Sequence, residues 1–353
     1  MKRPPPCHRG GHIPKYQIKF KKDTSSNTYI KQITNKPLVE KTIYKYRGYL
    51  LNFASWCQKK YWVKKLPKTV EHLQDYIDFL VAEGKSPYSI YTYLAGVCHC
   101  LEVPLTSLSL PKRVSAKAVR SRGGHAVDKR ADAHRAASPR LYDFAAAVGI
   151  RRAEYAALKG DDIVRDENNY LCVRVKRGKG GKYQLQRLLP QDEMYVRSFF
   201  SGKPEDYVFT KSEMENKIDL HALRQKHAWD CYTYYLDRLK SEPDYRKQLE
   251  AEMYERWQAM QEYNRKKAKE KGKTWKSKKW NPKELQGIYK LRGENRKLAK
   301  KIGRPVEYDK CALMAVSIFH LSHWRSDVTV SNYILAVKSE EKNKKCRPYT
   351  KRK

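Results

Sequence analysis

Apolar residues recur at three- and four-residue spacing through the first third of the chain, the periodicity of helices that bury one face. One such stripe consists of Ile43, Tyr46, Leu50, Phe53 and Cys57. A second helix is predicted over 69–84 and a third over 86–101, where Ser86 followed by Pro87 is typical of a helix start. We therefore expect a compact helical domain over 37–110.

A mixed pattern follows over 136–353. Helices are predicted over 140–149 and 220–236, and a further one over 309–324. Between the first two, Leu171, Val173 and Val175 alternate with polar residues before a glycine-rich turn, which predicts a β-hairpin. The expected fold class is therefore mainly α with a small β-sheet, in which the helical domain precedes a mixed α/β domain.

Three segments depart from these patterns by their charge. Residues 1–36 are rich in lysine and predict a basic amino-terminal arm, and residues 111–135 are basic with little apolar content, as in a linker. Residues 232–304 are dense in Lys, Arg and Glu with sparse aromatic residues. That composition is typical of long exposed helices and predicts a charged helical insertion in the second domain, with a helical hairpin as one form it could take.

The charge balance indicates the kind of partner. The 353 residues include 75 Lys plus Arg against 38 Asp plus Glu, a formal charge of +37. Such an excess opposes compaction unless a polyanion offsets it, so nucleic acid is the favoured partner and an anionic membrane surface the second choice.

The apolar runs and the cysteines bear on where in the cell the protein is expected. No run of about 18 apolar residues occurs, and the basic start lacks the apolar stretch of a secretory signal, so we expect no membrane anchor. The eight cysteines include no pair of CxxC motifs. We expect free thiols in a reducing compartment, the cytoplasm and nucleoid of a prokaryotic host, and no metal site.

Five short motifs carry residue types that bind and cleave a phosphodiester. They are GIRRAE (149–154), the RGKGG turn with Lys179, HALR (221–224), VSIFHLSH ending at His323, and Tyr333 ten residues later. Arginine suits such a site because its planar guanidinium bonds two phosphate oxygens and keeps its charge. In order and spacing, these motifs resemble the boxes of tyrosine recombinases, the phage-integrase family. The preceding helical domain is similar to that family's core-binding domain, so the resemblance covers about residues 38–230 and 305–337.

The resemblance implies how the phosphate is held. Arg151 and Arg224 would bond the non-bridging oxygens of the scissile phosphate, and His323 would add a third hydrogen bond. Glu154 falls on the acidic position of the first box, as a structural residue near the site. No metal ion or other cofactor is implied.

The resemblance also implies the chemical step. Tyr333 would attack phosphorus, leaving a 3′-phosphotyrosine and a free 5′-hydroxyl, and His221 would help to move the tyrosine proton. Lys179 would protonate the leaving oxygen. A tyrosine has a pKa of about 10, so a dense cationic pocket is what makes its oxygen usable at neutral pH.

Partners follow from the same resemblance. The expected function is a site-specific recombinase or integrase of a mobile element, acting on double-stranded DNA sites as a homotetramer, with accessory DNA-bending or excision factors as further partners. Basic residues of the linker are expected to lie along the phosphate backbone. These are Lys112, Arg113, Lys117, Arg120 and Arg122.

Two alternatives share parts of this evidence. A type IB topoisomerase or hairpin-resolving strand transferase would use the same tyrosine chemistry on one duplex. A basic DNA-binding protein without catalysis would carry the motifs by accident. The sequence also departs from the family pattern: Ser322 stands where a glycine is usual, Gln225 where a histidine is frequent, and 232–304 lengthens the interval between His221 and His323.

Overall fold

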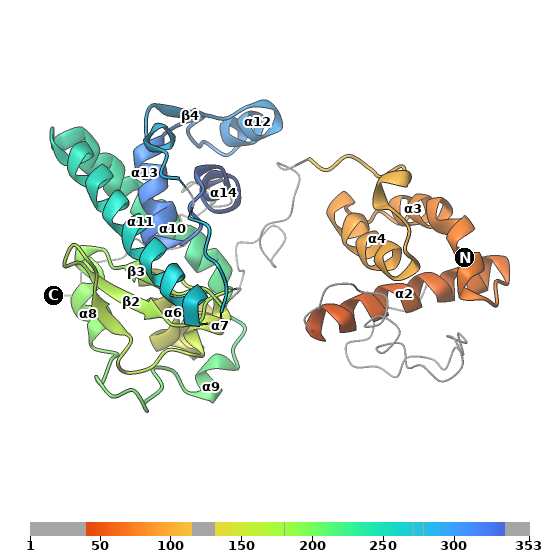
Figure 1. The fold of residues 1–353 in the computed structure, drawn as a ribbon, viewed down its shortest axis with the longest axis horizontal. Coiled ribbons are helices and arrows are strands. Elements are labelled where there is room, and N and C mark those ends of the chain that lie inside the picture. Colours follow the sequence, from red (N-terminus) through yellow and green to blue (C-terminus); the bar gives the residue numbers. More distant parts are fainter. Residues whose placement is uncertain (1–39, 115–130, 180, 271, 278, 336–353) are drawn as a thin grey trace. The chain divides into compact units, whose positions relative to one another are not determined.

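The computed structural model describes residues 40–114, 131–179, 181–270, 272–277 and 279–335. The chain divides into two compact units, Met1–Val114 and Ser115–Lys353 (Figure 1). The predicted arm over 1–36 lies outside the described residues.

The first unit is entirely helical within its described part. It contains α2 (Glu40–Tyr61), a 3-10 turn η1 (Leu66–His72), α3 (Leu73–Ala82), α4 (Pro87–Leu101) and a short η2 (Leu105–Ser107). Its core includes Leu50 and Phe53 of α2, so the predicted stripe faces inward. The Ser86 side chain accepts a hydrogen bond from the backbone nitrogen of Ser89 and caps α4 as expected.

The second unit is built around one helix. Its α10 (Leu220–Ser241) packs against α6 (Pro139–Ala147), α13 (Lys310–Ala315) and two π-helical turns, η6 (Val316–His320) and η7 (Val330–Ile334). The other helices of this unit are α5 (Ala131–Ala137), α7 (Arg152–Tyr155), η4 (Pro190–Asp192), α8 (Glu193–Arg197), α9 (Lys211–Met214), α11 (Tyr245–Glu270), η5 (Pro282–Glu284), α12 (Gly293–Lys301) and α14 (Ser326–Thr329).

Two small antiparallel sheets complete the unit. The first has the order β1 (Ile163–Arg165), β2 (Leu171–Val175) and β3 (Gln184–Arg187), with Val173 opposite Gln186. The second pairs β4 (Ile288–Lys290) with β5 (Glu307–Asp309). A mainly helical chain with a small β-sheet is thus confirmed, and the predicted hairpin is β2–β3. Among the described helices, none combines the length and apolar character that crossing a membrane requires.

Three boundaries differ from the predictions. The last residues of the expected linker, 131–135, are helical and belong to α5. The helix expected over 69–84 begins as the 3-10 turn η1. The helix expected over 309–324 gives way to the π-helical η6 and ends at His320, so His323 lies in a turn rather than on a helix.

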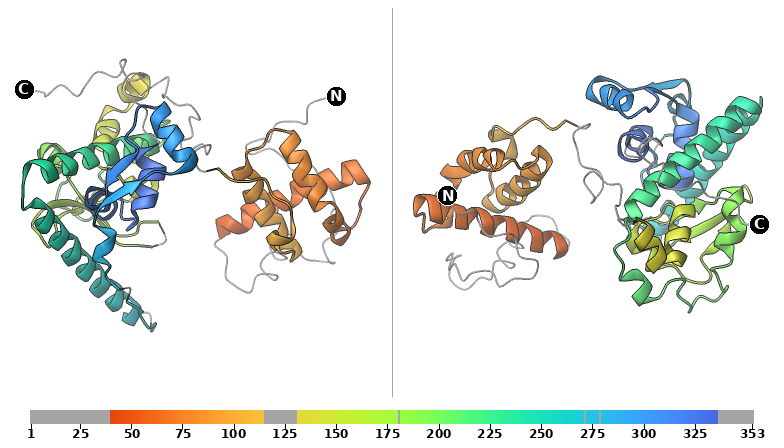
Figure 2. Two further views of the ribbon diagram at one scale, coloured as in Figure 1. Left: turned by 90° about the horizontal axis from the view of Figure 1, so that it is seen from above. Right: turned by 180° about the vertical axis from the view of Figure 1, so that it is seen from behind.

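The expected charged helical insertion over 232–304 contains one long helix, α11 (Tyr245–Glu270), but it is not exposed throughout. Residues 232–241 continue α10, and α11 buries Tyr245, Leu249 and Met253 in the same core as α13. Between the end of α11 and residue 304 the described residues form only η5, β4 and α12, so no second long helix completes a hairpin there. The far end of α11 does extend beyond the rest of the unit (Figure 2, left).

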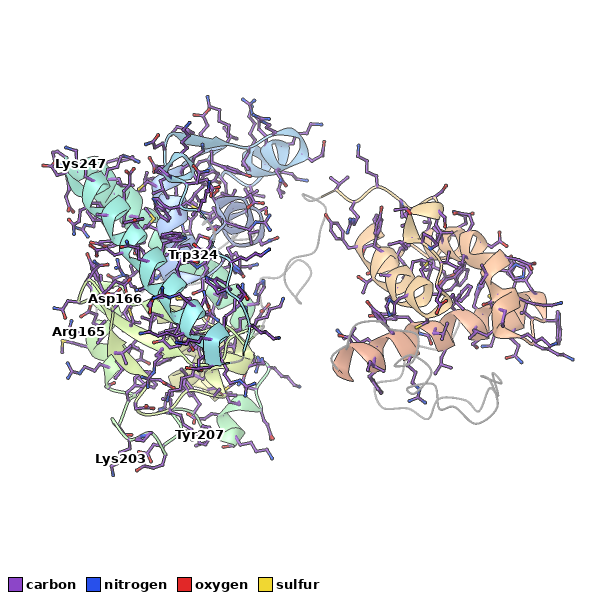
Figure 3. The ribbon with its side chains drawn as sticks, in the orientation of Figure 1. Arg165, Asp166, Lys203, Tyr207, Lys247 and Trp324 are labelled. Atoms are coloured by element: carbon purple, nitrogen blue, oxygen red, sulfur yellow. The ribbon has the colours of Figure 1, made fainter. Side chains whose placement is uncertain are left out.

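A buried ion network fastens α11 to the first sheet. The Asp166 carboxylate, fully buried at the end of β1, accepts hydrogen bonds from Arg187 of β3 and Arg256 of α11, each at 2.6 Å. Arg187 also pairs with Glu252 of α11. In Figure 3, Asp166 is labelled beside the sheet that α11 crosses. This part of the insertion is therefore structural.

We predict that Asp166→Asn lowers the free energy of unfolding by about 3 kcal/mol, because it leaves two buried guanidinium groups with too little negative charge. Urea denaturation measures the loss. The matched control is Asp244→Asn, at an exposed carboxylate 3.8 Å from Lys247, which should change the free energy by less than about 0.5 kcal/mol. Equal effects of the two substitutions would contradict the network's role.

Candidate active site

The six residues that the motifs single out come from five places in the second unit. Arg151 is the N-cap of α7, Lys179 lies in the β2–β3 turn, and His221 and Arg224 lie in the first turn of α10. His323 follows the π-helical η6, and Tyr333 lies in η7.

The hydroxyl of Tyr333 is held by His323. Tyr333 Oη lies 2.7 Å from His323 Nε2, and the tyrosine side chain is only 6% exposed. The His221 ring centroid is 5.7 Å from the Tyr333 ring centroid, and the Arg224 guanidinium carbon is 5.4 Å from it. The tyrosine, both histidines and one arginine therefore form a single cluster.

His323 is a neutral imidazole at physiological pH. Burial lowers its pKa most, and together with the positive charges of Arg224, Arg151, Lys182 and Lys179, in that order of effect, brings it to about 3. Both arginines and the Lys179 turn therefore lie within electrostatic reach of the His323 ring. A neutral ring nitrogen that faces a hydroxyl can accept its proton.

Arg224 is a buried cation that no carboxylate of the described residues bonds. Its side chain is 1% exposed, and Nη1 donates to the carbonyl oxygen of Gly149 while Nη2 donates to that of Leu321 at 2.9 Å. Its Nε, also buried, has no hydrogen-bond partner among the described residues. Burial lowers the pKa of Arg224, which shows the cost of holding this charge away from water.

The start of α10 fixes the neighbouring histidine. The Asp219 carboxylate caps the helix by accepting hydrogen bonds from the backbone nitrogens of His221 and Ala222, both at 3.1 Å. Burial lowers the pKa of His221, and the charge of Arg224 adds to this effect.

Glu154 joins the first arginine to the lysine turn. One oxygen accepts the backbone N–H of Arg151 and the other accepts its guanidinium, both at 2.8 Å. The second oxygen also accepts the backbone N–H of Lys179 and the Gln184 amide, both at 3.3 Å. Burial alone would raise the pKa of Glu154, but the charge and hydrogen bonds of Arg151 outweigh it and hold that pKa below the usual range.

The lysine turn requires glycine at one position. A Cβ on Gly178 would lie 1.6 Å from the Gln184 amide nitrogen, so a side chain there would displace the contact with Glu154. The Lys179 side chain is exposed. The turn thus presents a flexible ammonium group from a backbone that is fixed by Glu154.

Three polar residues near the cluster were not predicted. Ser322 has a φ of +52°, a left-handed conformation that explains why the resembling family has glycine here. Its Oγ accepts a hydrogen bond from Gln186 of β3 at 2.7 Å, which ties the His323 turn to the sheet. Gln225 donates to the carbonyl oxygen of Asn332 at 3.1 Å, beside Tyr333. The departures from the family pattern at positions 322 and 225 were the sequence signals for Ser322 and Gln225.

The linker residues are described only in part. Arg113 stacks its guanidinium 4.0 Å from the ring centroid of Tyr91 in the first unit, and Lys112 is exposed. Lys117, Arg120 and Arg122 lie outside the described residues. In the described part of the chain, one cluster has the chemistry of metal ligands, His227, Cys231 and His320.

Comparison with known proteins adds little. No protein-family model and no curated protein matches the chain. A crystal structure of XerA recombinase is similar at 21% identity, over 57% of this chain and 81% of that chain, with a TM-score of 0.21. A similarity at that TM-score carries no argument, so the function must be argued from the site itself.

The pKa of Glu154 makes a pH-dependent prediction. Because the pKa is lower in the folded than in the unfolded chain, its stabilisation is complete above the unfolded value of about 4.3 and is lost as pH falls through the folded value. We predict that Glu154→Gln lowers the free energy of unfolding by about 2 kcal/mol at pH 7, and by progressively less below pH about 4.

Urea denaturation at several pH values measures this difference. Glu205→Gln is the control, because Glu205 is an exposed carboxylate, and it should show no pH-dependent difference from the unsubstituted chain. A loss for Glu154→Gln that is the same at pH 3 and pH 7 would mean that the carboxylate charge is not its source.

Proposed function

We propose that this chain is a tyrosine-type site-specific DNA recombinase. The observation that carries the proposal is the Tyr333 hydroxyl, held 2.7 Å from a neutral histidine nitrogen on which Arg224, Arg151 and Lys179 act as nearby positive charges. A nucleophile, a proton acceptor and fixed positive charge are what phosphoryl transfer from DNA needs.

The proposed reaction needs no further reagent. Tyr333 Oη bonds to phosphorus, the bond from phosphorus to the 5′ oxygen breaks, and a 3′-phosphotyrosine forms. The tyrosine proton passes to a histidine, and Lys179 gives a proton to the leaving 5′ oxygen. The reverse reaction, with a 5′-hydroxyl from a second duplex, rejoins the strand and returns the tyrosine.

The hydrogen bond of Tyr333 bears on which histidine takes the proton. The resemblance assigns that task to His221 and a phosphate contact to His323. Here His323 Nε2 contacts the hydroxyl, whereas His221 is near the ring. We therefore assign the transfer of the tyrosine proton, in both directions, to His323 and leave His221 to the phosphate.

The arginines supply the charge stabilisation. Arg224 is held by two backbone carbonyls rather than by a carboxylate, so its positive charge stays available to an incoming anion. Arg151 is ion-paired with Glu154, but the Arg151 side chain is 26% exposed, whereas that of Glu154 is 3% exposed. Both guanidinium groups suit the non-bridging oxygens, whose negative charge grows as the tyrosine attacks.

Recombination requires paired duplexes, and we propose a homotetramer on double-stranded DNA sites of a mobile element, with bending or excision factors as accessory partners. A topoisomerase-like enzyme would make the same covalent intermediate on one duplex. Exchange of strands between two differently labelled duplexes distinguishes the two activities.

The covalent step is tested with a pool of nicked duplexes of random sequence, in which loss of the short cut fragment traps any intermediate. We predict a protein–DNA adduct that survives denaturation with the unsubstituted chain and is lost with Tyr333→Phe. Tyr207→Phe, at an exposed tyrosine, should keep it. Sequencing of the trapped DNA then gives the preferred site.

An adduct that persists in Tyr333→Phe would place the nucleophile elsewhere. Absence of an adduct with every variant, under conditions where the chain binds the same DNA, would favour a DNA-binding protein without catalysis.

The exposed part of the insertion gives a second prediction. Lys273, Lys276 and Lys279 are exposed in the segment after α11. If they contact phosphates, changing all three to glutamine should reduce the salt dependence of DNA affinity by about 2.7 in the slope of log K against log salt concentration. Deletion of 240–300 is unsuitable as a test, because it removes part of the core.

Fluorescence anisotropy on duplex DNA at several salt concentrations measures this slope. The charge-matched control changes Lys203, Lys211 and Lys247 to glutamine; two of these are labelled at opposite ends of the unit in Figure 3. The control should leave the slope unchanged. A slope that is equally unchanged in the first variant would show that the segment does not touch phosphates.

A further inference from the structure

Helix α10 carries a second polar face beyond the residues of the proposed active site. His227, Cys231 and Tyr235 follow one another at four-residue spacing, so they share one face of the helix. The π-helical η6 adds His320 to them. All four side chains are buried, and none of them takes part in the reaction proposed above.

The donor atoms of three of these residues have the spacing of metal ligands. One potential ligand atom from each of His227, Cys231 and His320 lies within 4.8 Å of the others. Cys231 Sγ is 3.4 Å from His227 Nε2. A tetrahedral ion with Zn–S of about 2.3 Å and Zn–N of about 2.0–2.1 Å holds such atoms about 3.5 Å apart.

His320 is not satisfied by the protein alone. Its Nε2 lies 3.0 Å from the Tyr235 hydroxyl, whereas Nδ1 has no hydrogen-bond partner although the ring is completely buried. The backbone of Arg187 interacts with the ring as a hydrogen-bond acceptor, but its geometry does not satisfy Nδ1. A buried ring nitrogen without a hydrogen-bond partner is rare in protein cores, so it indicates a site for a ligand.

The surroundings of His227 have the form usual for a metal-bound histidine. Nε2 faces Cys231, and the backbone of Ala146 interacts with the ring as a hydrogen-bond acceptor. Such an outer partner fixes which nitrogen is free to bind. A Cβ on Gly149 would lie 2.5 Å from the His227 ring, so the ring is also held by close packing.

We propose that His227, Cys231 and His320 bind one zinc ion as a structural centre, with a water molecule in the fourth position and the Tyr235 hydroxyl as the outer hydrogen-bond partner of His320 Nε2. Two imidazoles and one thiolate suit a borderline-soft ion with tetrahedral preference. Binding forms the sulfur–zinc bond and releases the Cys231 thiol proton to solvent. The expectation of a chain without a metal site is thereby revised.

The position of the ion between two segments of the proposed active site defines its structural role. Arg224 lies three residues before His227 on α10, and His323 lies three residues after His320. An ion shared by His227 and His320 therefore fixes α10 against the segment that leads into the His323 turn. Metal binding itself is measured without DNA, so it stands or falls independently of the recombinase proposal.

The test uses the full-length chain, reduced and freed of metal by dialysis against a chelator. Titration with Co²⁺ should produce a thiolate-to-cobalt absorption band in the near ultraviolet that saturates at one ion per chain. After incubation with Zn²⁺ and gel filtration, elemental analysis should find one zinc per chain. Zinc should also raise the melting temperature by about 5 °C.

Two cysteine variants provide the matched comparison. Cys231→Ser should lose the cobalt band and the thermal shift, whereas Cys311→Ser, which removes another fully buried thiol of the same unit, should keep both. Circular dichroism is the check that each variant is folded. If Cys231→Ser does not fold, His320→Gln replaces it, with the same loss expected.

Three results would overturn the proposal. One is the absence of a cobalt band and of bound zinc in the unsubstituted chain, which would leave a metal-free cluster with a thiol hydrogen bond to His227. Another is a band that survives in Cys231→Ser, which would assign the thiolate to a different cysteine. The third is zinc binding without any change in melting temperature, which would exclude a structural centre.

Discussion

The second unit depends on one buried positive charge. Arg224 lies in the interior of the protein, and the carbonyl oxygens of Gly149 and Leu321 hold it in place of a carboxylate. Those carbonyls belong to the two segments that carry Arg151 and His323. A guanidinium buried in this way fixes three parts of the chain at once, and no carboxylate of the described residues lies within ion-pair distance of it.

The rest of the cluster follows from that charge. The pKa of His323 falls because the ring is buried and because Arg224 has the largest effect of the nearby positive charges. The ring therefore stays neutral and can act as a hydrogen-bond acceptor for the Tyr333 hydroxyl. Glu154 neutralises part of Arg151 and holds the Lys179 turn from the other side. The proposed function requires this arrangement to complement the charge and oxygen geometry of a phosphodiester.

The proximity of several candidate residues could be predicted from the sequence, because each motif keeps its residues close together on a local element. Arg151 and Glu154 form their contacts within one turn of chain, and His221 and Arg224 share the first turn of α10. The glutamine contacts were not readable, since Gln186 meets Ser322 across 136 positions and Gln225 meets Asn332 across 107. Long-range pairs of neutral side chains leave no periodic pattern.

The fold shows the same division. The helices of the first unit were predicted by their apolar stripes, and the β2–β3 hairpin by alternation and its glycine turn. The inward face of α11 was missed, because Glu252 and Arg256 are charged residues that are buried only through partners on distant strands. A charged composition predicts exposure unless such partners are known. The cluster of His227 and Cys231 was missed for a similar reason, since His320 completes it from another element.

The central claim is that Tyr333 becomes covalently bonded to DNA, and mass spectrometry of the trapped adduct tests it most directly. Digestion of the adduct with nuclease and trypsin should yield the peptide 326–338, SDVTVSNYILAVK, whose single tyrosine is Tyr333. The account predicts a residual nucleotide on that peptide, linked through its 3′-phosphate. A nucleotide on any other peptide, or one linked through its 5′-phosphate, would contradict it.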